Sequence, residues 1–518
     1  MTATIPNPVW APNVSEPQAF PIEVFNDTCT ASRPLGPYIS ARFGWYWRLP
    51  GTGTIRVKAD HPLAARLMSC KRAVVPIRTH YNGVPWSGRV FDAVMEGKPG
   101  EEIVTATLMG DLYWVLTLLC WVNPFFPPEV QIGLTGKQDI MFGPVDFVYK
   151  YFLAKNVIRM QKPVYAKLPI QYHVPELPQL DDLDTLDDIL DAIHAFTSDL
   201  CVVSARFTRL DELMENAIAV SDRGLTAELW VPKDGPSPWV FNTDTLARLA
   251  NVLDLSGDNF FWFTNPDNVL GLADPDQWGK LQHPGIVFDT RIKRDRTWME
   301  WRTDSGWITH YKRGVSHPRA HSAIVGGKAP DFINQGVEWA ANLALKFLLN
   351  ILLPGAGLGD ILVGDLFDDI FFAYQRFDDP QLEADLGPFA FGEIFADNSN
   401  AYSLDSWAVG VAALNEAGGG ESFKIEVQAG INGRGFQFGA DDGSGTRFRE
   451  GDIMSFYDRG TRVANYISSV EVEDQRGGRT TEYISVGDDD AAEDAMTVLL
   501  GRVKDLANFS RSMANSTG

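Results

Sequence analysis

Short runs of alternating apolar and polar residues dominate the chain between residues 40 and 165. TGTIRVKAD at 52–60 and EEIVTATLMG at 101–110 place apolar side chains at every second position. This period is typical of strands with one buried face. The turn NGVPWSG at 82–88 separates two such runs and predicts an antiparallel hairpin or a corner.

The middle of the chain contains both the two-residue period of strands and the three-to-four-residue period of helices. DLYWVLTLLCWVNPFFPPEVQ at 111–131 begins as a buried helix that we expect to end at Asn123-Pro124, since a residue before proline disfavours the helical region. Apolar residues at spacings of three and four then predict an amphipathic helix, through Leu183, Leu186, Leu190 and Ile193. GLTAELWVP at 224–232 is strand-like, and TWMEWRTDSGWITHYK at 297–312 predicts a hairpin that turns at Asp304-Ser305-Gly306.

Strand patterns return at 422–486, and a final helix follows the aspartates at 488–490. The sequence therefore predicts an α+β fold that is rich in β structure at both ends, mixed α/β in the middle, and interrupted by a helical insertion. A chain of 518 residues is too long for one core. We expect six segments: an N-terminal arm (1–36), a first β-rich domain (37–165), a mixed α/β domain (166–330), a hydrophobic helical hairpin (331–380), a second β-rich domain (381–487) and a C-terminal helix (488–518).

The hairpin segment is apolar enough to raise the question of a membrane span. Its first helix, Trp339 to Leu353, has fifteen residues and contains Asn342, Lys346 and Asn350. A span needs about 20 apolar residues, and a central lysine opposes insertion by about 2.5–3.5 kcal/mol. We therefore expect two apolar helices around the glycine turn at 354–357 and no resting transmembrane span.

Exposure of this hairpin to water is not tenable for a stable protein. Burial of a large apolar side chain is worth about 1.5–3 kcal/mol, so a dozen exposed ones would outweigh the stability of a typical domain, about 5–15 kcal/mol. The hairpin must pack on its own domain, on a partner, on another copy, or on a membrane contacted late. The residues that we expect to form this contact are Trp339, Leu343, Phe347, Leu348, Leu349, Leu352, Leu353, Leu358, Leu362, Leu366 and Phe371.

The C-terminal helix carries a second candidate interface. Apolar residues at alternating steps of four and three fit a seam of about three heptads between copies, although packing on the chain's own core is the simpler explanation of the pattern. The seam residues are Met496, Leu499, Val503, Leu506 and Met513.

Residues 291–328 are basic, whereas the chain as a whole is acidic. The net charge is −22, and an acidic surface repels DNA. Residues 291–328 nevertheless carry nine Lys and Arg against three acidic residues. They form either a docking face for an acidic partner or neighbouring subunit, or a solvated hairpin balanced by the aspartates at 181–191. The residues of this basic face are Arg291, Lys293, Arg294, Arg296, Arg302, Lys312 and Arg313.

Enzyme signatures are absent from the sequence. It contains no G-x-S-x-G, H-E-x-x-H or Walker motif, and GLTGKQ at 133–138 and GAGLG at 355–359 lack the flanking elements of phosphate-binding loops. We expect no catalytic residues, metal or cofactor. The four cysteines form no C-x-x-C pair, so we expect free thiols in a reducing cytoplasm.

Several motifs together resemble those of minor tail proteins of siphophages that infect actinobacteria. They lie in order over most of residues 37–485 and include GPYISARFG at 36–44, WSGRV at 86–90, LLCWVNPFFPPEVQ, FLAKNVIRM, IVGGKAPDFINQGVEWAANLAL, LFDDIFFAYQRFDD, GEIFADNSNAYSLDSW and FREGDIMSFYDRG.

The resemblance implies a hub at the tip of a long non-contractile tail. Such a hub is a homotrimer in which each copy carries two tail-tube-like β-barrel or sandwich domains. It closes the tail tube, contacts the distal tail ring, the tape-measure protein and receptor-binding proteins, and lets DNA pass at infection. The resemblance thus implies a virion protein, assembled in the bacterial cytoplasm, that touches DNA only in transit. Our own hypothesis is that three hairpins pack together in the hub and separate at infection to contact the host membrane.

Two alternatives stay open from the sequence. One is a virion-borne cell-wall hydrolase, because 67 acidic residues always offer carboxylate pairs. The other is a sugar-binding adhesin that uses aromatic residues such as those in FGWYW at 43–47.

Overall fold

The computed structural model describes residues 19–123, 127–129, 139–167, 200–221, 223–240, 279–315, 317–326, 375–389, 392–397, 401–403, 421–428, 435–476 and 480–487. The chain divides into two compact units, each assembled from separated stretches. Unit 1 comprises Met1–Tyr113, Arg294–Arg313 and Ser422–Gly518, and unit 2 comprises Trp114–Lys293 and Gly314–Glu421.

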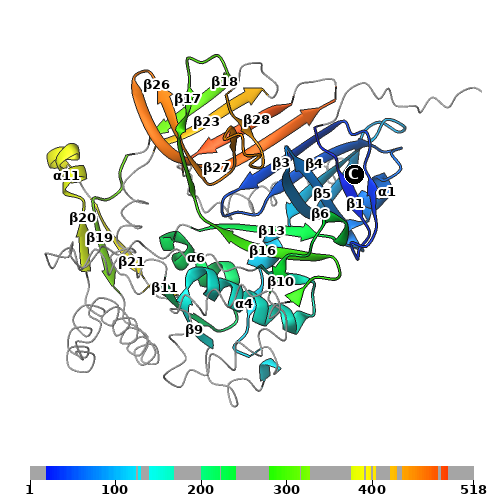
Figure 1. Cartoon of the computed structure of the whole chain (residues 1–518), viewed down its shortest axis with the longest axis horizontal. Coiled ribbons are helices and arrows are strands. Elements are labelled where there is room, and N and C mark those ends of the chain that lie inside the picture. The colour runs from blue at the N-terminus through cyan, green and yellow to red at the C-terminus, as the bar shows by residue number, and fades with distance from the viewer. Residues whose placement is uncertain are drawn as a thin grey trace, which may run out of the picture. The chain divides into compact units, whose positions relative to one another are not determined.

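Unit 1 is built on one large sheet of thirteen strands (Figure 1). The main path runs in the order β18-β23-β28-β27-β3-β4-β7-β6-β5-β1-β2, with β26 and β17 continuing from β27. The bounds are β1 (Glu23–Phe25), β2 (Ser32–Pro34), β3 (Ser40–Tyr46), β4 (Thr52–Lys58), β5 (Pro76–Tyr81), β6 (Val84–Glu96), β7 (Ile103–Gly110), β17 (Arg294–Arg302), β18 (Ile308–Val315), β23 (Glu421–Gln428), β26 (Asp452–Asp458), β27 (Thr461–Gln475) and β28 (Thr481–Val486).

The alternating pattern of the sequence is confirmed strand by strand. In β3, Ala41, Phe43 and Trp45 are buried while Arg42 points to the other face. The predicted hairpin forms between β5 and β6, and it turns at Asn82 and Gly83, which both have positive φ. Positive φ at both central residues is the conformation that a tight two-residue hairpin needs.

The long strand β27 joins the two ends of the sequence. Its first residues pair with β26, and Ser469 to Gln475 pair antiparallel with β3, from Tyr46 to Ser40. Figure 1 shows this junction, where the blue N-terminal strands meet the orange C-terminal ones. Strands from the stretches predicted as two β-rich domains therefore share one sheet.

One predicted hairpin is wrong in its pairing. The turn at 303–306 forms between β17 and β18, as the sequence indicated. In the described sheet, however, β17 pairs parallel with β26 and β18 pairs with β23. The buried side chains of β17, Met299 and Trp301, pack into the aromatic core of unit 1 with Phe436 and Phe448, and this long-range packing decides the partner of the strand.

Unit 2 combines small sheets with helices. The strand orders are β10-β16-β13, β22-β11-β9 and β20-β19-β21, with the two-stranded pairs β12-β8 and β14-β15. Its main elements are α2 (Leu112–Leu116), β8 (Leu119–Cys120), β9 (Asp139–Pro144), α4 (Val145–Met160), β10 (Val164–Ala166), β11 (Leu200–Ala205), β12 (Thr208–Arg209), α6 (Leu210–Ser221), β13 (Gly224–Trp230), β14 (Trp239–Val240), β15 (Gly279–Lys280), β16 (Gly285–Arg291), β19 (Ser322–Gly326), β20 (Gln375–Asp378), α11 (Pro380–Leu386), β21 (Glu393–Asp397) and β22 (Ala401–Ser403).

Two helices of unit 2 differ from the sequence expectation. Helix α4 lies in a stretch where short alternating runs predicted strands; Phe147, Val148 and Tyr149 are buried one after another, so the segment lacks the one-sided pattern of an amphipathic helix. Helix α2 ends at Leu116 rather than at Asn123, because Cys120 of β8 pairs with Thr208 of β12. Cys120 itself is a buried free thiol, as expected.

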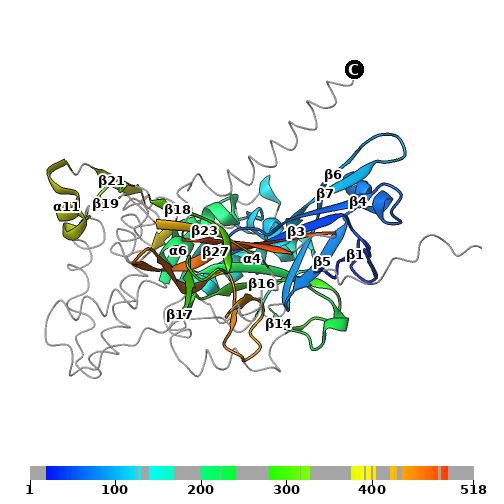
Figure 2. The same cartoon turned by 90° about the horizontal axis from the view of Figure 1, so that it is seen from above.

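The strands that flank the apolar segment are neighbours in one small sheet. Strand β19 ends at Gly326, β20 begins at Gln375, and Val325 pairs antiparallel with Gln375. Helix α11 follows β20 beside this small sheet (Figure 2). All the hairpin and C-terminal seam residues predicted as interfaces, and the predicted helix at 183–193, lie outside the described residues. Among the helices that are described, none is both long and apolar enough to span a membrane.

Candidate functional site

A polar row crosses the sheet of unit 1 at the junction of its two ends. Successive register pairs link Thr481, Glu473, Arg42, Thr54, Thr107 and Asp92, on strands β28, β27, β3, β4, β7 and β6. Side chains of directly opposed residues lie on the same face of a sheet. Their neighbours along the strands, including Phe43, Ile55 and Val472, are fully buried. One face of the sheet is therefore core and the other is polar.

Arg42 is the centre of this polar face. Its Nε donates to Glu471 Oε2 at 2.8 Å, its Nη2 also contacts Glu471, and its Nη1 lies 3.8 Å from Glu473 Oε2. The guanidinium carbon lies 4.8 Å from the centre of the Tyr483 ring. Two carboxylates and one aromatic ring thus surround an arginine whose side chain is 46% exposed.

Tyr46 extends this network from β3 to β4. Its hydroxyl donates to Glu471 Oε1 at 2.6 Å and lies 3.0 Å from Thr52 Oγ1. The ring can reach Glu471 because residue 44, which pairs with Glu471, is a glycine: a Cβ there would lie 2.8 Å from the Tyr46 ring. The network consequently ties β3 and β4 to β27 across the junction.

The acidic residues of this face favour the protonated forms of Arg42 and Tyr483. Burial opposes the charged form of Arg42, but the charges of Glu471 and Glu473 outweigh it and raise the pKa of the guanidinium. Burial, together with Glu473 and Glu426, raises the pKa of Tyr483, whose hydroxyl donates to Glu473 Oε2 at 3.4 Å. The cation is held by its acidic neighbours, and the phenol stays protonated.

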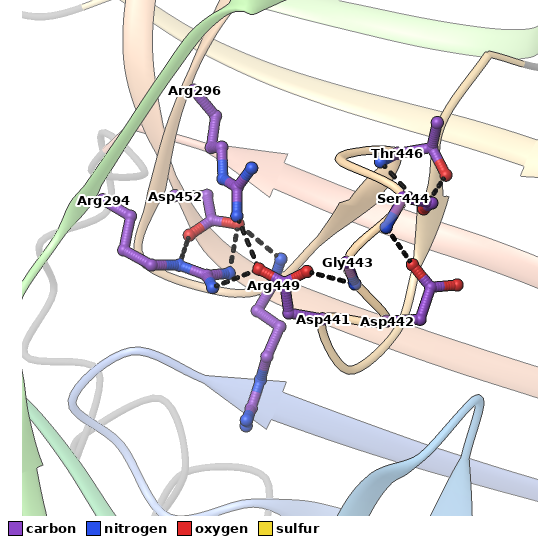
Figure 3. A network of polar contacts seen from close by, with 9 residues as sticks. All are labelled: Arg294, Arg296, Asp441, Asp442, Gly443, Ser444, Thr446, Arg449 and Asp452. Carbon is purple, nitrogen blue, oxygen red and sulfur yellow. Dashed lines mark hydrogen bonds and ion pairs between the residues drawn. The ribbon is translucent and has the colours of Figure 1, made fainter.

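The predicted basic face turns out to contain many intrachain ion pairs. Arg294 donates from Nε and Nη2 to the two oxygens of Asp452 at 2.7 and 2.8 Å, and Arg296 donates to Asp441 at 2.8 Å. Figure 3 shows both arginines directed at these carboxylates, at the base of the loop 441–446. The backbone N–H of Arg449 also donates to Asp452, at 2.8 Å.

Hydrogen bonds within the loop 441–446 fix its shape. Asp441 accepts from the Gly443 N–H and Asp442 from the Ser444 N–H, both at 3.0 Å, and the hydroxyls of Ser444 and Thr446 lie 2.7 Å apart (Figure 3). Hydrogen bonds from Ser444 lower the pKa of Asp442 to about 2. These are interactions of a structured turn, and they do not by themselves indicate a ligand.

A second group of basic residues surrounds the turn at 303–306. Arg302 donates to Asp304 at 2.9 Å and to Glu300 at 3.2 Å, and Arg462 contacts Glu300 at 3.0 Å. Arg313 lies 3.6 Å from the buried carboxylate of Asp458. The acidic residues that balance this stretch therefore come from within it and from 441–458, whereas the aspartates at 181–191 lie outside the described residues.

The remaining residues of the basic face are divided between the units. Lys312 lies on β18, is exposed, and has no ion pair within the described part of the chain. Arg291 ends β16 and Lys293 follows it, both in unit 2. The structure therefore brings Arg294 and Arg296 together, and separately Arg302 and Arg313 near the next turn. The docking role of these residues stays a prediction.

Unit 2 contains a buried charge cluster that sequence reasoning missed. Lys150 Nζ lies 2.9 Å from Asp146 Oδ1 and 3.0 Å from Asp289 Oδ1, and Lys167 lies 3.0 Å from the other oxygen of Asp289. Burial opposes the charge of Lys150, but Asp146 and Asp289 outweigh it and raise its pKa. The spacing of Asp146 and Lys150, four residues apart, was the available signal, whereas Asp289 comes from β16.

No group of three or more His, Cys, Asp and Glu side chains in the described residues has the arrangement of a metal site. The polar face carries hydroxyls, carboxylates and the paired Arg42, together with the exposed cations Arg56 and Lys58 of β4.

The chain is similar to known phage proteins. A family model described as Siphovirus ReqiPepy6 Gp37-like protein matches residues 21–488. No curated protein sequence matches the chain.

Solved structures similar to the chain include three tail proteins. The 43 kDa tail protein of prophage MuSo2 from Shewanella oneidensis is 8% identical, with 90% of this chain and 98% of that chain covered and a TM-score of 0.44. A tail protein from Neisseria meningitidis MC58 is 9% identical, with 91% and 97% covered and a TM-score of 0.40. The prophage tail protein gp18 from Listeria monocytogenes EGD-e is 9% identical, with 93% and 99% covered and a TM-score of 0.34.

Proposed function

Because the chain belongs to the family of Siphovirus ReqiPepy6 Gp37-like proteins, we propose that it is a structural protein of the phage tail and that three copies form the hub at the tail tip. The observation that carries this proposal is the pairing of β3 with β27. This pairing joins strands near the two ends of the sequence into one sheet, which has a buried face and a polar face.

Three such sheets, one from each copy, would enclose a central channel when they are arranged in a ring. Each copy contributes two groups of strands to its sheet, so three copies supply six groups around an axis, and closed rotational symmetry is the usual form of homo-oligomers. The net charge of −22 suits a surface past which DNA must move without binding. In this role the protein closes the tail tube in the virion and lets DNA pass at infection.

The apolar segment at 331–380 and the C-terminal seam are the proposed contacts between copies. The strands on either side of residues 327–374, β19 and β20, pair with each other, so the intervening residues can serve an assembly while this small sheet stays intact. In this proposal the distal tail ring, the tape-measure protein and the receptor-binding proteins contact other surfaces of the hub. The segment reaches the host membrane only after the hub opens.

Electron microscopy of the purified protein tests the hub directly. Averaged images are expected to show a ring with threefold symmetry and a central opening. Replacement of Leu348 and Leu349 by aspartate is expected to abolish the ring. Rings of any other symmetry, or rings that persist in this variant, would contradict the proposal.

A sugar-binding role is a second candidate, because Trp298 on β17 is 60% exposed. A Cβ at Gly445, in the neighbouring loop, would lie 3.9 Å from its ring. An exposed indole beside a fixed polar loop is a surface on which a sugar ring stacks. Binding of cell-wall glycans by the protein, lost in Trp298→Ala, would favour this function, and clearing of peptidoglycan in a zymogram would instead reveal a hydrolase.

A further inference from the structure

We propose that the side chains of Lys150 and Asp289 join in an isopeptide bond, with Asp146 as the group that transfers protons while the bond forms. The bond links helix α4 to strand β16 inside unit 2, where the two elements lie side by side (Figure 1). The reaction requires only the folded chain and is therefore separate from the proposed tail function.

Lys150 lies between two carboxylates in the interior of unit 2. Its Nζ is 2.9 Å from Oδ1 of Asp146 and 3.0 Å from Oδ1 of Asp289. The side chains of Lys150 and Asp146 are fully buried, and that of Asp289 is 10% exposed. Reactants that are fixed in a suitable orientation reach effective concentrations of about 10⁵–10⁸ M, and the exclusion of water opposes hydrolysis of the product.

The carboxyl group of Asp289 is also held by a second cation. Lys167 Nζ lies 3.0 Å from Asp289 Oδ2, and the backbone N–H of Thr290 donates to Oδ1 at 3.0 Å. Addition of an amine to Cγ places negative charge on Oδ2, and a cation fixed beside this oxygen stabilises that charge. Asp289 is therefore the residue that accepts the new bond.

Asp146 provides the route for the protons. Burial opposes the charge of Lys150, but the two carboxylates outweigh it and raise its pKa, so Nζ becomes a nucleophile only when it gives a proton to Asp146. The bond from Nζ to Cγ of Asp289 then forms and the Cγ–Oδ1 bond breaks. Oδ1 leaves as water with two protons from Nζ, one of them delivered by Asp146. One ammonium and one carboxylate become one amide and one water, and no oxidant or other reactant is needed.

The reaction removes two charges from a buried site. Ions that have been taken out of water are costly even when they are paired. The amide replaces the charges of Lys150 and Asp289 and leaves Lys167 and Asp146, which have opposite signs. The net charge of the cluster is therefore unchanged, while the number of buried ions falls.

Apolar packing holds the helix on the strand without the bond. The rings of Tyr149 and Phe288, which directly precede the reacting residues in the sequence, are buried and stack with their centres 4.9 Å apart. Variants that lack the bond are therefore expected to keep the fold.

A second lysine of α4 serves as the internal control. Lys155 Nζ lies 2.6 Å from Oδ2 of Asp139, and the two side chains are 17% and 11% exposed. In the described part of the chain Lys155 contacts only this one carboxylate, so no second acid there is placed to take its proton. We expect these two residues to remain an ion pair.

Tryptic digestion of the denatured wild-type protein, followed by mass spectrometry, tests the bond. Trypsin cleaves after lysine and arginine, but not after a lysine whose amine has become an amide. The expected product is residues 138–155 joined to residues 281–291, lighter than the two peptides together by one water. Cleavage after Lys155 in this product shows that the amine of the control residue is free.

Every other result of the digest counts against the bond. Peptides 138–150 and 281–291 that are found only separately would overturn it. A loss of water within residues 138–155 alone would place the bond on Asp146, and a link at Lys167 would mean that a different amine reacts. Either result would overturn the assignment. The wild-type digest does not depend on the folding of any variant.

Two variants test the roles of the residues. Lys150→Arg keeps the positive charge and is expected to give no joined product. Asp146→Asn keeps the shape of the side chain but cannot take a proton. Because such proton transfer contributes about 10²–10⁴-fold to a rate, freshly made Asp146→Asn should be mostly unlinked, with a linked fraction that rises on storage. Complete linkage in fresh Asp146→Asn would show that Asp146 does not transfer the proton.

Discussion

The hydroxyl of Tyr46 donates a 2.6 Å hydrogen bond to Glu471, 425 residues later in the chain. This contact closes the junction at which β3 meets β27. It also orients the carboxylate that holds Arg42, so the stability of the sheet and the electrostatics of its polar face depend on the same pair of side chains.

Replacement of Tyr46 by phenylalanine should therefore destabilise unit 1. The variant loses the hydrogen bonds to Glu471 and Thr52 but keeps the ring. We expect the free energy of unfolding to fall by about 1 kcal/mol, the usual loss for a hydrogen bond of this kind, measured by urea denaturation followed by tryptophan fluorescence. Tyr457→Phe is the control, since the Tyr457 ring packs against Arg302 and keeps that contact as phenylalanine. Equal effects of the two changes would argue against a special role for Tyr46.

Replacement of different arginines of the predicted basic face should lower the free energy of unfolding by different amounts. Arg294 forms a two-bonded pair with Asp452, whose side chain is only 2% exposed. Arg294→Met leaves that buried carboxylate without its cation, and we expect a loss of up to about 3 kcal/mol in the free energy of unfolding. The same denaturation experiment on Arg302→Met should show no measurable change, because its partners Glu300 and Asp304 are solvent-accessible. A stability loss in Arg302→Met as large as in Arg294→Met would contradict the distinction.

Asp442 should titrate far below an ordinary aspartate. Hydrogen bonds from Ser444, followed by the interaction with Arg447, lower its pKa to about 2. A depressed pKa in the folded state means that the loop gains stability above the unfolded pKa of about 3.9 and loses it as the pH falls towards 2. Carboxyl ¹³C chemical shifts of labelled aspartate should show this midpoint, and Ser444→Ala should move it upward. A midpoint near 4 in the wild type would mean that the loop is not held by these bonds.

The apolar segment should be removable without loss of the rest of the fold. Val325 and Gln375 are paired neighbours, so Asn-Gly in place of residues 327–373 provides a two-residue turn between β19 and β20. We expect unchanged strand content by circular dichroism and unchanged unfolding of unit 1, together with loss of trimer formation. A variant that cannot fold would show that the segment is part of a core.

The sequence predicted individual strands well and their partners poorly. Alternation located β4, β7, β13, β27 and β28, because burial of every second side chain is a local signal. The pairing of β17 with β26 and that of β27 with β3 each join residues more than a hundred positions apart. For the same reason the polar residues of β3 and β27 could be assigned to a solvent face, but the ion pair of Arg42 with Glu471 could not be foreseen.

Several partners of the basic stretch are likewise distant in sequence. Counting along the chain found the acidic residues Asp295, Glu300 and Asp304 within the basic stretch, but not Asp441, Asp452 and Asp458, which reach it through the pairing of β17 with β26. Family resemblance, in contrast, needs no pairing information. The motifs predicted a siphophage family, and the match to a siphovirus family model over residues 21–488 confirms it.

The mass of the protein in solution tests the central claim most directly. Multi-angle light scattering over a range of concentrations is expected to give three times the chain mass of 57.4 kDa, and a single chain mass for the variant that lacks residues 327–373. A wild-type protein that stays at one chain mass at every concentration, with a well-folded sheet, would contradict the trimeric hub.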